Sequence, residues 1–234
     1  MQKADAVLQK KKDDRGINII NDEIIIEVNE VFKKYDDATV LDNVSLEIEK
    51  GKIYGLVGRN GSGKTVLMKC ICGLIKPTSG EVKVAGKTVG KDVDIPEDIG
   101  VIIETPGFIP NYSGFKNLKL LASVRNKISN EEIRKSMEIV GLDPKSRKHV
   151  GKYSLGMRQK LGIAQAIMEK PKILILDEPM NGLDNESVAV VRKILKEQAE
   201  NGATIILASH NREDIDVLCD KVYTMDHGVI ECER

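Results

Sequence analysis

The chain has 234 residues, 31% of them charged and 41% hydrophobic, and its 36 basic residues balance its 36 acidic ones. This length is enough for one sizeable domain with a buried core. The net charge of zero gives no sign of nucleic-acid binding, which usually needs a basic face. No apolar run is long enough to span a bilayer. We therefore expect a soluble protein with no nucleic-acid partner.

The N-terminus and the cysteines both indicate a cytoplasmic protein. Residues 1–22 are interpreted as a polar extension, because their start, MQKADAVLQKKKDDR, lacks the apolar stretch of a signal peptide. No second cysteine pair or histidine pair completes a zinc site, so we expect reduced thiols. The cysteines are Cys70, Cys72, Cys219 and Cys232.

The first hundred residues alternate between strand and helix patterns. Period-2 alternation predicts a strand over 40–49, and apolar residues at helical spacing predict a helix after residue 64 that ends near Gly73. Further strands are expected over 24–32 and 52–58, and a polar hairpin over 80–89.

Helix patterns dominate from 111 to 170, where Ser129 and Glu132 form a capping box. Strand–helix alternation then returns, so an α/β core is interrupted by a helical insert. The expected elements are a strand ending at 177, helices over 185–200 and near 212–218, a strand over 204–208 and a closing hairpin over 221–231.

Residues 58–65, GRNGSGKT, match the phosphate-binding pattern GxxxxGK[ST] between a predicted strand and a predicted helix, the context that this motif requires. Glycines allow backbone N–H groups to curve around phosphate oxygens, and the helix N-terminus adds positive potential. We predict an ATP site with Lys64 on the β- and γ-phosphates and the Thr65 hydroxyl on Mg²⁺. The predicted binding residues are Gly58, Asn60, Gly61, Ser62, Gly63, Lys64 and Thr65.

Two acidic residues follow the apolar run ILIL at 173–176. Asp177 stands at the carboxyl end of this predicted strand, where ligands bind in open α/β sheets, so we expect it to hold Mg²⁺. Glu178 is placed to activate an attacking water as a general base. Together with the phosphate-binding loop, these residues predict a P-loop NTPase, a class with many unrelated functions.

The heptapeptide YSLGMRQ, residues 153–159, narrows this class. It has no obvious nucleophile, base or metal ligand, and it resembles the signature motif of ABC-type ATPases. The order of the other motifs agrees: P-loop, helical insert, signature, ILILDEP, and His210 after a strand. The resemblance covers nearly the whole chain. It implies an ABC ATPase domain over 23–234, with a RecA-like core, an antiparallel β subdomain and an inserted helical subdomain near 106–165.

The resemblance also implies roles for single residues. Ser154 and Gly156 of one subunit would bind the γ-phosphate held by the P-loop of a second subunit, which predicts an ATP-dependent homo- or heterodimer. The heptapeptide is therefore expected to act in the other subunit's site and not in its own, although Ser154 is also a good helix N-cap. Tyr35 matches the aromatic residue that stacks on adenine, His210 the histidine that reaches the γ-phosphate, and Asp184 the loop that contacts the opposite subunit.

Two positions depart from the family pattern. Leu155 stands where the signature usually has the first of two glycines, and Glu104, in IIETPGF, stands where the family usually has glutamine. A carboxylate at position 104 brings a charge near the phosphates, so Glu104 is a candidate catalytic residue and metal ligand. Alternatively, it is only a hinge into the helical subdomain.

The absence of a membrane segment implies a separate integral membrane permease, with this chain as a peripheral cytoplasmic subunit on the inner face of the cell membrane. IIETPGF and YSLGMRQKLGIAQAIM resemble ATPases of bacterial exporters linked to bacitracin or lantibiotic self-protection. We expect ATP hydrolysis coupled to export of peptide antibiotics or similar compounds. The loop 106–112, with Phe108, Ile109 and Tyr112, is expected either to touch the permease or to pack the insert onto the core.

Other ABC-type ATPases remain as alternatives. The main one is a soluble assembly scaffold of the iron–sulfur type, which has no transport role. A ribosome-acting ATPase usually carries two cassettes, and a DNA-repair ATPase carries a long coiled coil. This sequence has one P-loop and a short insert, so both of these classes fit poorly.

Overall fold

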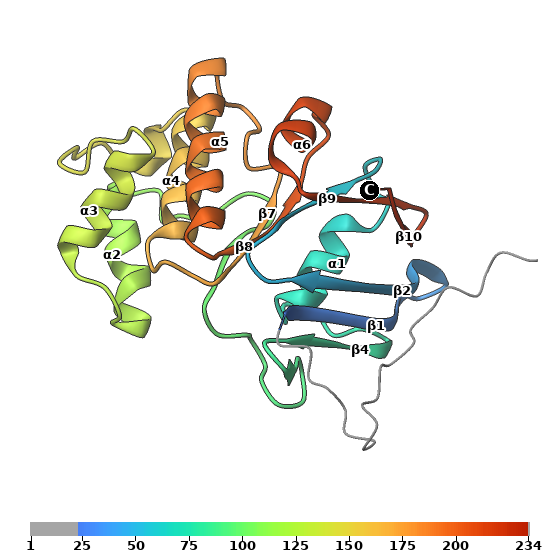
Figure 1. Cartoon of the computed structure of the whole chain (residues 1–234). Coiled ribbons are helices and arrows are strands. Elements are labelled where there is room, and N and C mark those ends of the chain that lie inside the picture. The colour runs from blue at the N-terminus through green and yellow to red at the C-terminus, as the bar shows by residue number, and fades with distance from the viewer. Residues whose placement is uncertain (1–22, 234) are drawn as a thin grey trace, which may run out of the picture.

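The centre of the fold is a six-stranded sheet in the order β10-β9-β3-β8-β7-β6, shown in Figure 1 in the computed structural model, which describes residues 23–233. Neighbouring strands are parallel except for the antiparallel pair β9 and β10. The strands are β3 (Ile53–Val57), β6 (Ile99–Ile102), β7 (Ile173–Asp177), β8 (Thr204–Ala208), β9 (Lys221–Asp226) and β10 (Val229–Cys232).

Strands β7 and β8 are nearly continuous apolar runs because both faces of the sheet are covered. In β7, Leu174 and Leu176 belong to one hydrophobic cluster, whereas Ile173 and Ile175 belong to the other. Successive side chains of a strand point to opposite faces, so four adjacent apolar residues serve two cores.

A second, four-stranded antiparallel sheet has the order β2-β1-β4-β5. Helix α1 (Lys64–Ile71) lies between the two sheets (Figure 1), and its buried apolar residues share one cluster with both. Residues 58–63 connect the end of β3 to the start of α1. The strands are β1 (Ile24–Tyr35), β2 (Ala38–Glu49), β4 (Ser79–Val84) and β5 (Lys87–Thr88).

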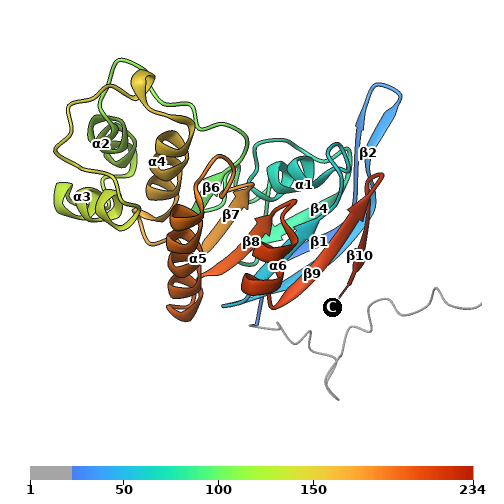
Figure 2. The same cartoon turned by 90° about the horizontal axis from the view of Figure 1, so that it is seen from above.

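Helices α4 (Leu155–Ile167), α5 (Asn185–Glu200) and α6 (Arg212–Leu218) lie on the other face of the large sheet, whereas α2 (Gly114–Arg125) and α3 (Asn130–Ile139) pack beside α4, away from the sheet (Figure 2). All five helices contribute to one hydrophobic cluster. Each of these helices begins with a side-chain cap, and the capping box of Ser129 and Glu132 is confirmed. The 3₁₀ turn η1 is Val150–Lys152.

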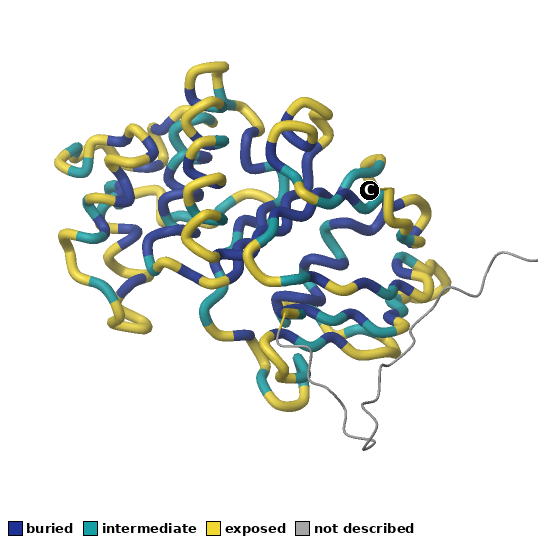
Figure 3. Tube along the Cα trace, in the orientation of Figure 1, coloured by how far each residue is buried: buried dark blue, intermediate teal, exposed yellow. Residues whose placement is uncertain are grey.

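Figure 3 shows that buried residues are concentrated in the large sheet, whereas exposed residues lie at the outer turns of the insert. Cys70 and Cys72 lie in that interior, where burial raises the pKa of their thiols to about 11 and about 12. Among residues 23–233, no helix combines the length and apolar character needed to cross a membrane. The predicted extension, residues 1–22, lies outside the described residues.

Nearly all predicted elements are confirmed, but no sequence pattern predicts β6. Its four residues, IGVI, pair with β7 from Ile99 opposite Ile173 to Ile102 opposite Leu176. A run this short has no readable period. Its strand conformation depends on a partner more than seventy residues away, and it delivers Glu104 to the site two residues after it ends.

Candidate functional site

A cleft of about 460 Å³ lies at the carboxyl ends of β3 and β7, and it brings together segments that are far apart in the sequence. This is the edge at which open α/β sheets bind ligands. The lining residues are Val40, Asn60, Gly61, Gly63, Lys64, Thr65, Val66, Glu104, Thr105, Pro106, Leu155, Arg158, Gln159, Asp177, Glu178 and Asn181.

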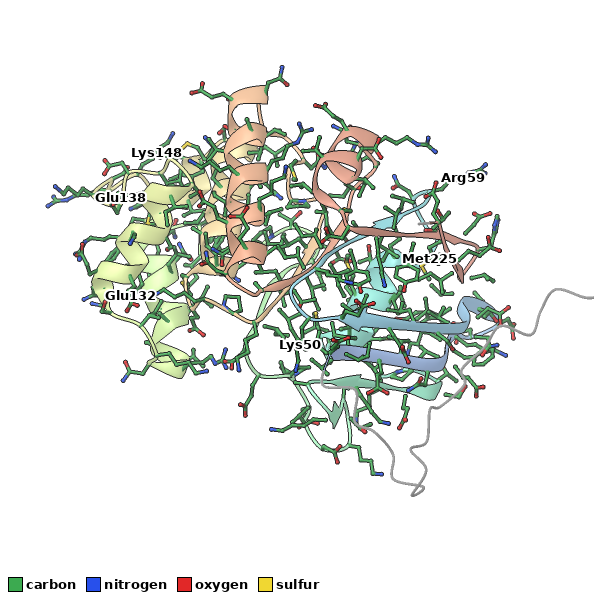
Figure 4. All side chains as sticks on the ribbon, in the orientation of Figure 1. Lys50, Arg59, Glu132, Glu138, Lys148 and Met225 are labelled. Atoms are coloured by element: carbon green, nitrogen blue, oxygen red, sulfur yellow. The ribbon has the colours of Figure 1, made fainter. Side chains whose placement is uncertain are left out.

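Glycines shape the P-loop because other residues would collide with its neighbours. A Cβ at Gly58 would lie 2.1 Å from the carbonyl oxygen of Met225, the β9 residue labelled in Figure 4. A Cβ at Gly63, whose φ is 110°, would lie 2.8 Å from the carbonyl oxygen of Val40. Gly63 is also the N-cap of α1 and supplies no side chain, so the first N–H groups of the helix remain available to an anion.

The charge at the centre of this loop is Lys64. Its ammonium group donates hydrogen bonds to the carbonyl oxygens of Gly58 (2.7 Å) and Arg59 (3.0 Å). Burial lowers the pKa of Lys64, while Asp177 and Glu178 act in the opposite direction. Nearby, the buried hydroxyl of Ser62 has no hydrogen-bond partner within the described part of the chain. Both groups offer donors to a phosphate.

The side chains of Thr65 and Asp177 lie next to each other, as predicted for two ligands of one metal ion. The Thr65 hydroxyl donates to a carboxylate oxygen of Asp177 at 2.6 Å. No cluster of three or more acidic, histidine or cysteine residues that could hold a metal lies within residues 23–233. Mg²⁺ is usually held by one or two carboxylates together with phosphate oxygens and waters, and Asp177 would supply such a carboxylate.

Glu178 and His210 form a second pair beside the first. One carboxylate oxygen of Glu178 lies 2.7 Å from Nδ1 of His210, whose ring is otherwise exposed. The backbone of Glu178 is in the left-handed region, with a φ of 50°. Its N–H donates to the carbonyl oxygen of Ala208 at 2.9 Å, which ties the end of β7 to the end of β8.

Glu104 lines the cleft, but its carboxylate pairs with Lys69 of α1 at 2.6 Å. Sequence reasoning missed Lys69, which shows only as a basic residue in the last turn of α1. The predicted adenine-stacking residue, Tyr35, is exposed at the end of β1 and does not line the cleft. Lys33 lies over its ring at 4.8 Å.

The signature heptapeptide contributes to this chain's own cleft, which the sequence analysis did not expect. Ser154 is exposed and caps α4 by accepting a hydrogen bond from the N–H of Met157. Ser154 and Gly156 do not line the cleft, but Leu155, Arg158 and Gln159 do. Gln159 could have been singled out as a polar residue on the apolar face of a predicted helix.

The sequence matches the family model described as ABC transporter over residues 41–181. It is 48% identical to the uncharacterized ABC transporter ATP-binding protein YybJ of Bacillus subtilis, over 88% of this chain and 95% of that protein. It is 43% identical to the bacitracin transport ATP-binding protein BcrA of Enterococcus faecalis, over 88% of this chain and 68% of that protein. It is 36% identical to the lantibiotic transport ATP-binding protein SrtF of Streptococcus pyogenes, over 90% of each.

Solved structures share the fold. A dimeric post-hydrolysis state of the ATP-binding cassette MJ0796 bound to ADP and Pi has a TM-score of 0.80 at 22% identity, over 90% of this chain and 99% of that one. An ATP binding subunit of an ABC transporter has a TM-score of 0.80 at 26% identity, over 89% and 90%. The predicted α/β P-loop architecture is confirmed.

Proposed function

The chain belongs to the family of ABC transporter ATP-binding proteins, and on this premise we propose that it powers export of peptide antibiotics through a separate membrane permease. The chain is an ATPase, and the assembly-scaffold alternative gains no support from the relatives. The proposed substrate class is supported by the names of two relatives, a bacitracin and a lantibiotic transport protein.

Hydrolysis uses the residues gathered in the cleft. Lys64 and the α1 N-terminus bind phosphate oxygens, while Thr65 and Asp177 would hold a Mg²⁺ ion that neutralises charge on the β- and γ-phosphates. Glu178 accepts the proton of the attacking water, and the 2.7 Å contact with His210 orients its carboxylate. The Glu178–His210 pair at the mouth of the P-loop is the observation that carries this assignment.

The direct test is Glu178→Gln, with Glu200→Gln on the exposed end of α5 as the matched control. We expect kcat to fall by about 10²–10⁴-fold, as for loss of a general base, with the KM for ATP nearly unchanged. The control should keep the wild-type rate. Wild-type turnover by Glu178→Gln would place the base elsewhere.

The geometry of the signature segment supports a dimer. Ser154, the N-cap of α4, is exposed and does not line this chain's cleft, so its hydroxyl is available to a nucleotide held by a second subunit. The Glu178→Gln variant should elute as a dimer with ATP and Mg²⁺ and as a monomer without them. A monomer at saturating ATP would argue for an obligate heterodimer or against this arrangement.

The loop 106–112 supports contact with a permease at the inner face of the membrane. Phe108 is half-buried against the core, which is the packing role that the sequence analysis left open, whereas Ile109 is 39% exposed. The side chain of Asn117 accepts from the N–H of Ile109 at 2.8 Å and donates to its carbonyl oxygen at 3.1 Å. Ile109 is therefore a rigidly presented apolar residue.

Ile109→Asp tests this contact, with Ile95→Asp as the control because Ile95 is 59% exposed on a distant loop. Ile109→Asp should abolish co-purification with the permease and lower cellular resistance to bacitracin-like peptides, while the ATPase rate of the isolated subunit is kept. Loss of the ATPase rate as well would indicate a folding role. If deletion of the intact system changes sensitivity to no peptide antibiotic, the substrate class is wrong.

A further inference from the structure

The first turns of α4 lie against the segment that carries Glu178. Gln159 is only 9% exposed, and its amide nitrogen donates to the carbonyl oxygens of Glu178 (3.2 Å) and Pro179 (2.9 Å). A side-chain amide nitrogen has two hydrogens, so one group satisfies two successive backbone acceptors. Without this donor, two carbonyl groups in the interior would lose a hydrogen bond.

These bonds act on a residue whose backbone is strained. A φ of 50° is unfavourable for glutamate and persists only where the surroundings determine it. The N–H of Glu178 donates to Ala208, and its carbonyl oxygen also accepts from the N–H of Asn181 at 3.1 Å. Gln159 completes this set from another element. The backbone conformation fixes the direction of the Glu178 side chain toward His210.

A second contact joins the same two segments. The side chain of Leu155 lies on Gly182, where an added Cβ would be 2.5 Å from Cδ2 of Leu155. An added Cβ at Gly156 would lie 3.0 Å from the carbonyl oxygen of Gly182. Leu155 therefore packs where the family usually has glycine, and the signature segment is attached to the turn after Glu178 at two points.

We propose that Gln159 is a positioning residue for Glu178, so that the signature helix of each subunit also sets the hydrolytic geometry of its own site. The inference rests on the proposed function, in which Glu178 is the general base. It implies that a nucleotide bound to Ser154 from the opposite subunit acts on this chain's Glu178 through less than two turns of α4.

The test is Gln159→Met, which keeps the size of the side chain and removes the donor, with Gln165→Met on the same helix as the matched control. A small displacement of a catalytic group lowers kcat steeply, so we expect Gln159→Met to lose roughly 10–100-fold. The KM for ATP should stay within about two-fold, because phosphate binding does not use this contact. Gln165→Met should keep kcat. If Gln159→Met lowers the melting temperature, kcat is compared at a temperature at which circular dichroism shows both proteins fully folded.

A double-variant cycle separates positioning from general loosening. In the Glu178→Gln background, Gln159→Met should lower the rate by no more than about two-fold, since the contribution of Glu178 is already lost. If the rate losses of Gln159→Met and Glu178→Gln multiply, or if Gln159→Met leaves kcat unchanged, the inference is overturned. Neither result would affect the proposed general base. Wild-type turnover by Glu178→Gln would instead overturn the proposed general base, and the inference with it.

Discussion

Gly182→Ala is expected to destabilise the protein through two separable effects. Gly182 has a φ of 75°, and the left-handed conformation costs alanine about 1–2 kcal/mol. The added Cβ would also lie 2.5 Å from Cδ2 and 2.7 Å from Cγ of Leu155. Overpacking costs typically about 1–3 kcal/mol, and the lower end applies here because Leu155 is 53% exposed and its side chain can turn outward. The expected total is about 2–3 kcal/mol.

Two further variants isolate these effects in urea denaturation. Gly86→Ala gives the backbone cost alone, because Gly86 has a φ of 76° and nothing within 4 Å of an added Cβ. Leu155→Ala removes the colliding atoms, so the cycle of Leu155→Ala with Gly182→Ala should show a favourable coupling of about 1 kcal/mol. A coupling of zero, or equal losses in Gly182→Ala and Gly86→Ala, would refute the contact.

Three further outcomes are expected from single substitutions. Lys64→Ala should abolish ATP binding in a nucleotide titration, because it removes the charge at the centre of the P-loop, and binding at wild-type affinity would contradict this assignment. Lys69→Met removes the partly exposed ion pair with Glu104, which is worth about 0.2–1 kcal/mol. If Glu104 is a metal ligand, the Mg²⁺ concentration for half-maximal turnover should therefore fall by up to about five-fold. An unchanged Mg²⁺ curve would identify Glu104 as a hinge only. Arg192→Met should lower the free energy of unfolding by about 3 kcal/mol or more, because Asp214 is buried and accepts two hydrogen bonds from Arg192 at 2.8 and 2.6 Å. A loss under about 1 kcal/mol in urea denaturation would contradict this.

The sequence was sufficient for those parts of the site that depend on local chain geometry. The P-loop is a strand, a glycine-rich turn and a helix start in succession, and Asp177 ends a buried strand, so spacing alone predicted that Lys64, Thr65 and Asp177 would gather. The helix caps at Ser129 and Ser154 were predictable for the same reason.

What the sequence could not supply are contacts that depend on how separate elements pack. The pair of Lys69 and Glu104 joins α1 to the end of β6, a strand that has no local signal. Gln159 was hidden because a polar residue in an apolar helix pattern gives no indication of which carbonyl groups it reaches. The position of Leu155 on Gly182 requires the tertiary fold, since 27 positions separate them in the sequence and both lie in segments whose motifs suggest other roles.

The strand order has a consequence for synthesis of the protein on the ribosome. Strand β3, which leads into the P-loop, has as its neighbours β8 and β9, so both of its hydrogen-bonded edges come from the last fifth of the chain. A nascent chain that has emerged through α1 therefore carries every residue of the phosphate-binding loop but neither of the strands that hold it. At roughly 5–20 residues per second, the missing partners arrive about 8–30 seconds later. During this interval both hydrogen-bonding edges of β3 lack their partners, so the phosphate-binding loop is not yet held in place for ATP.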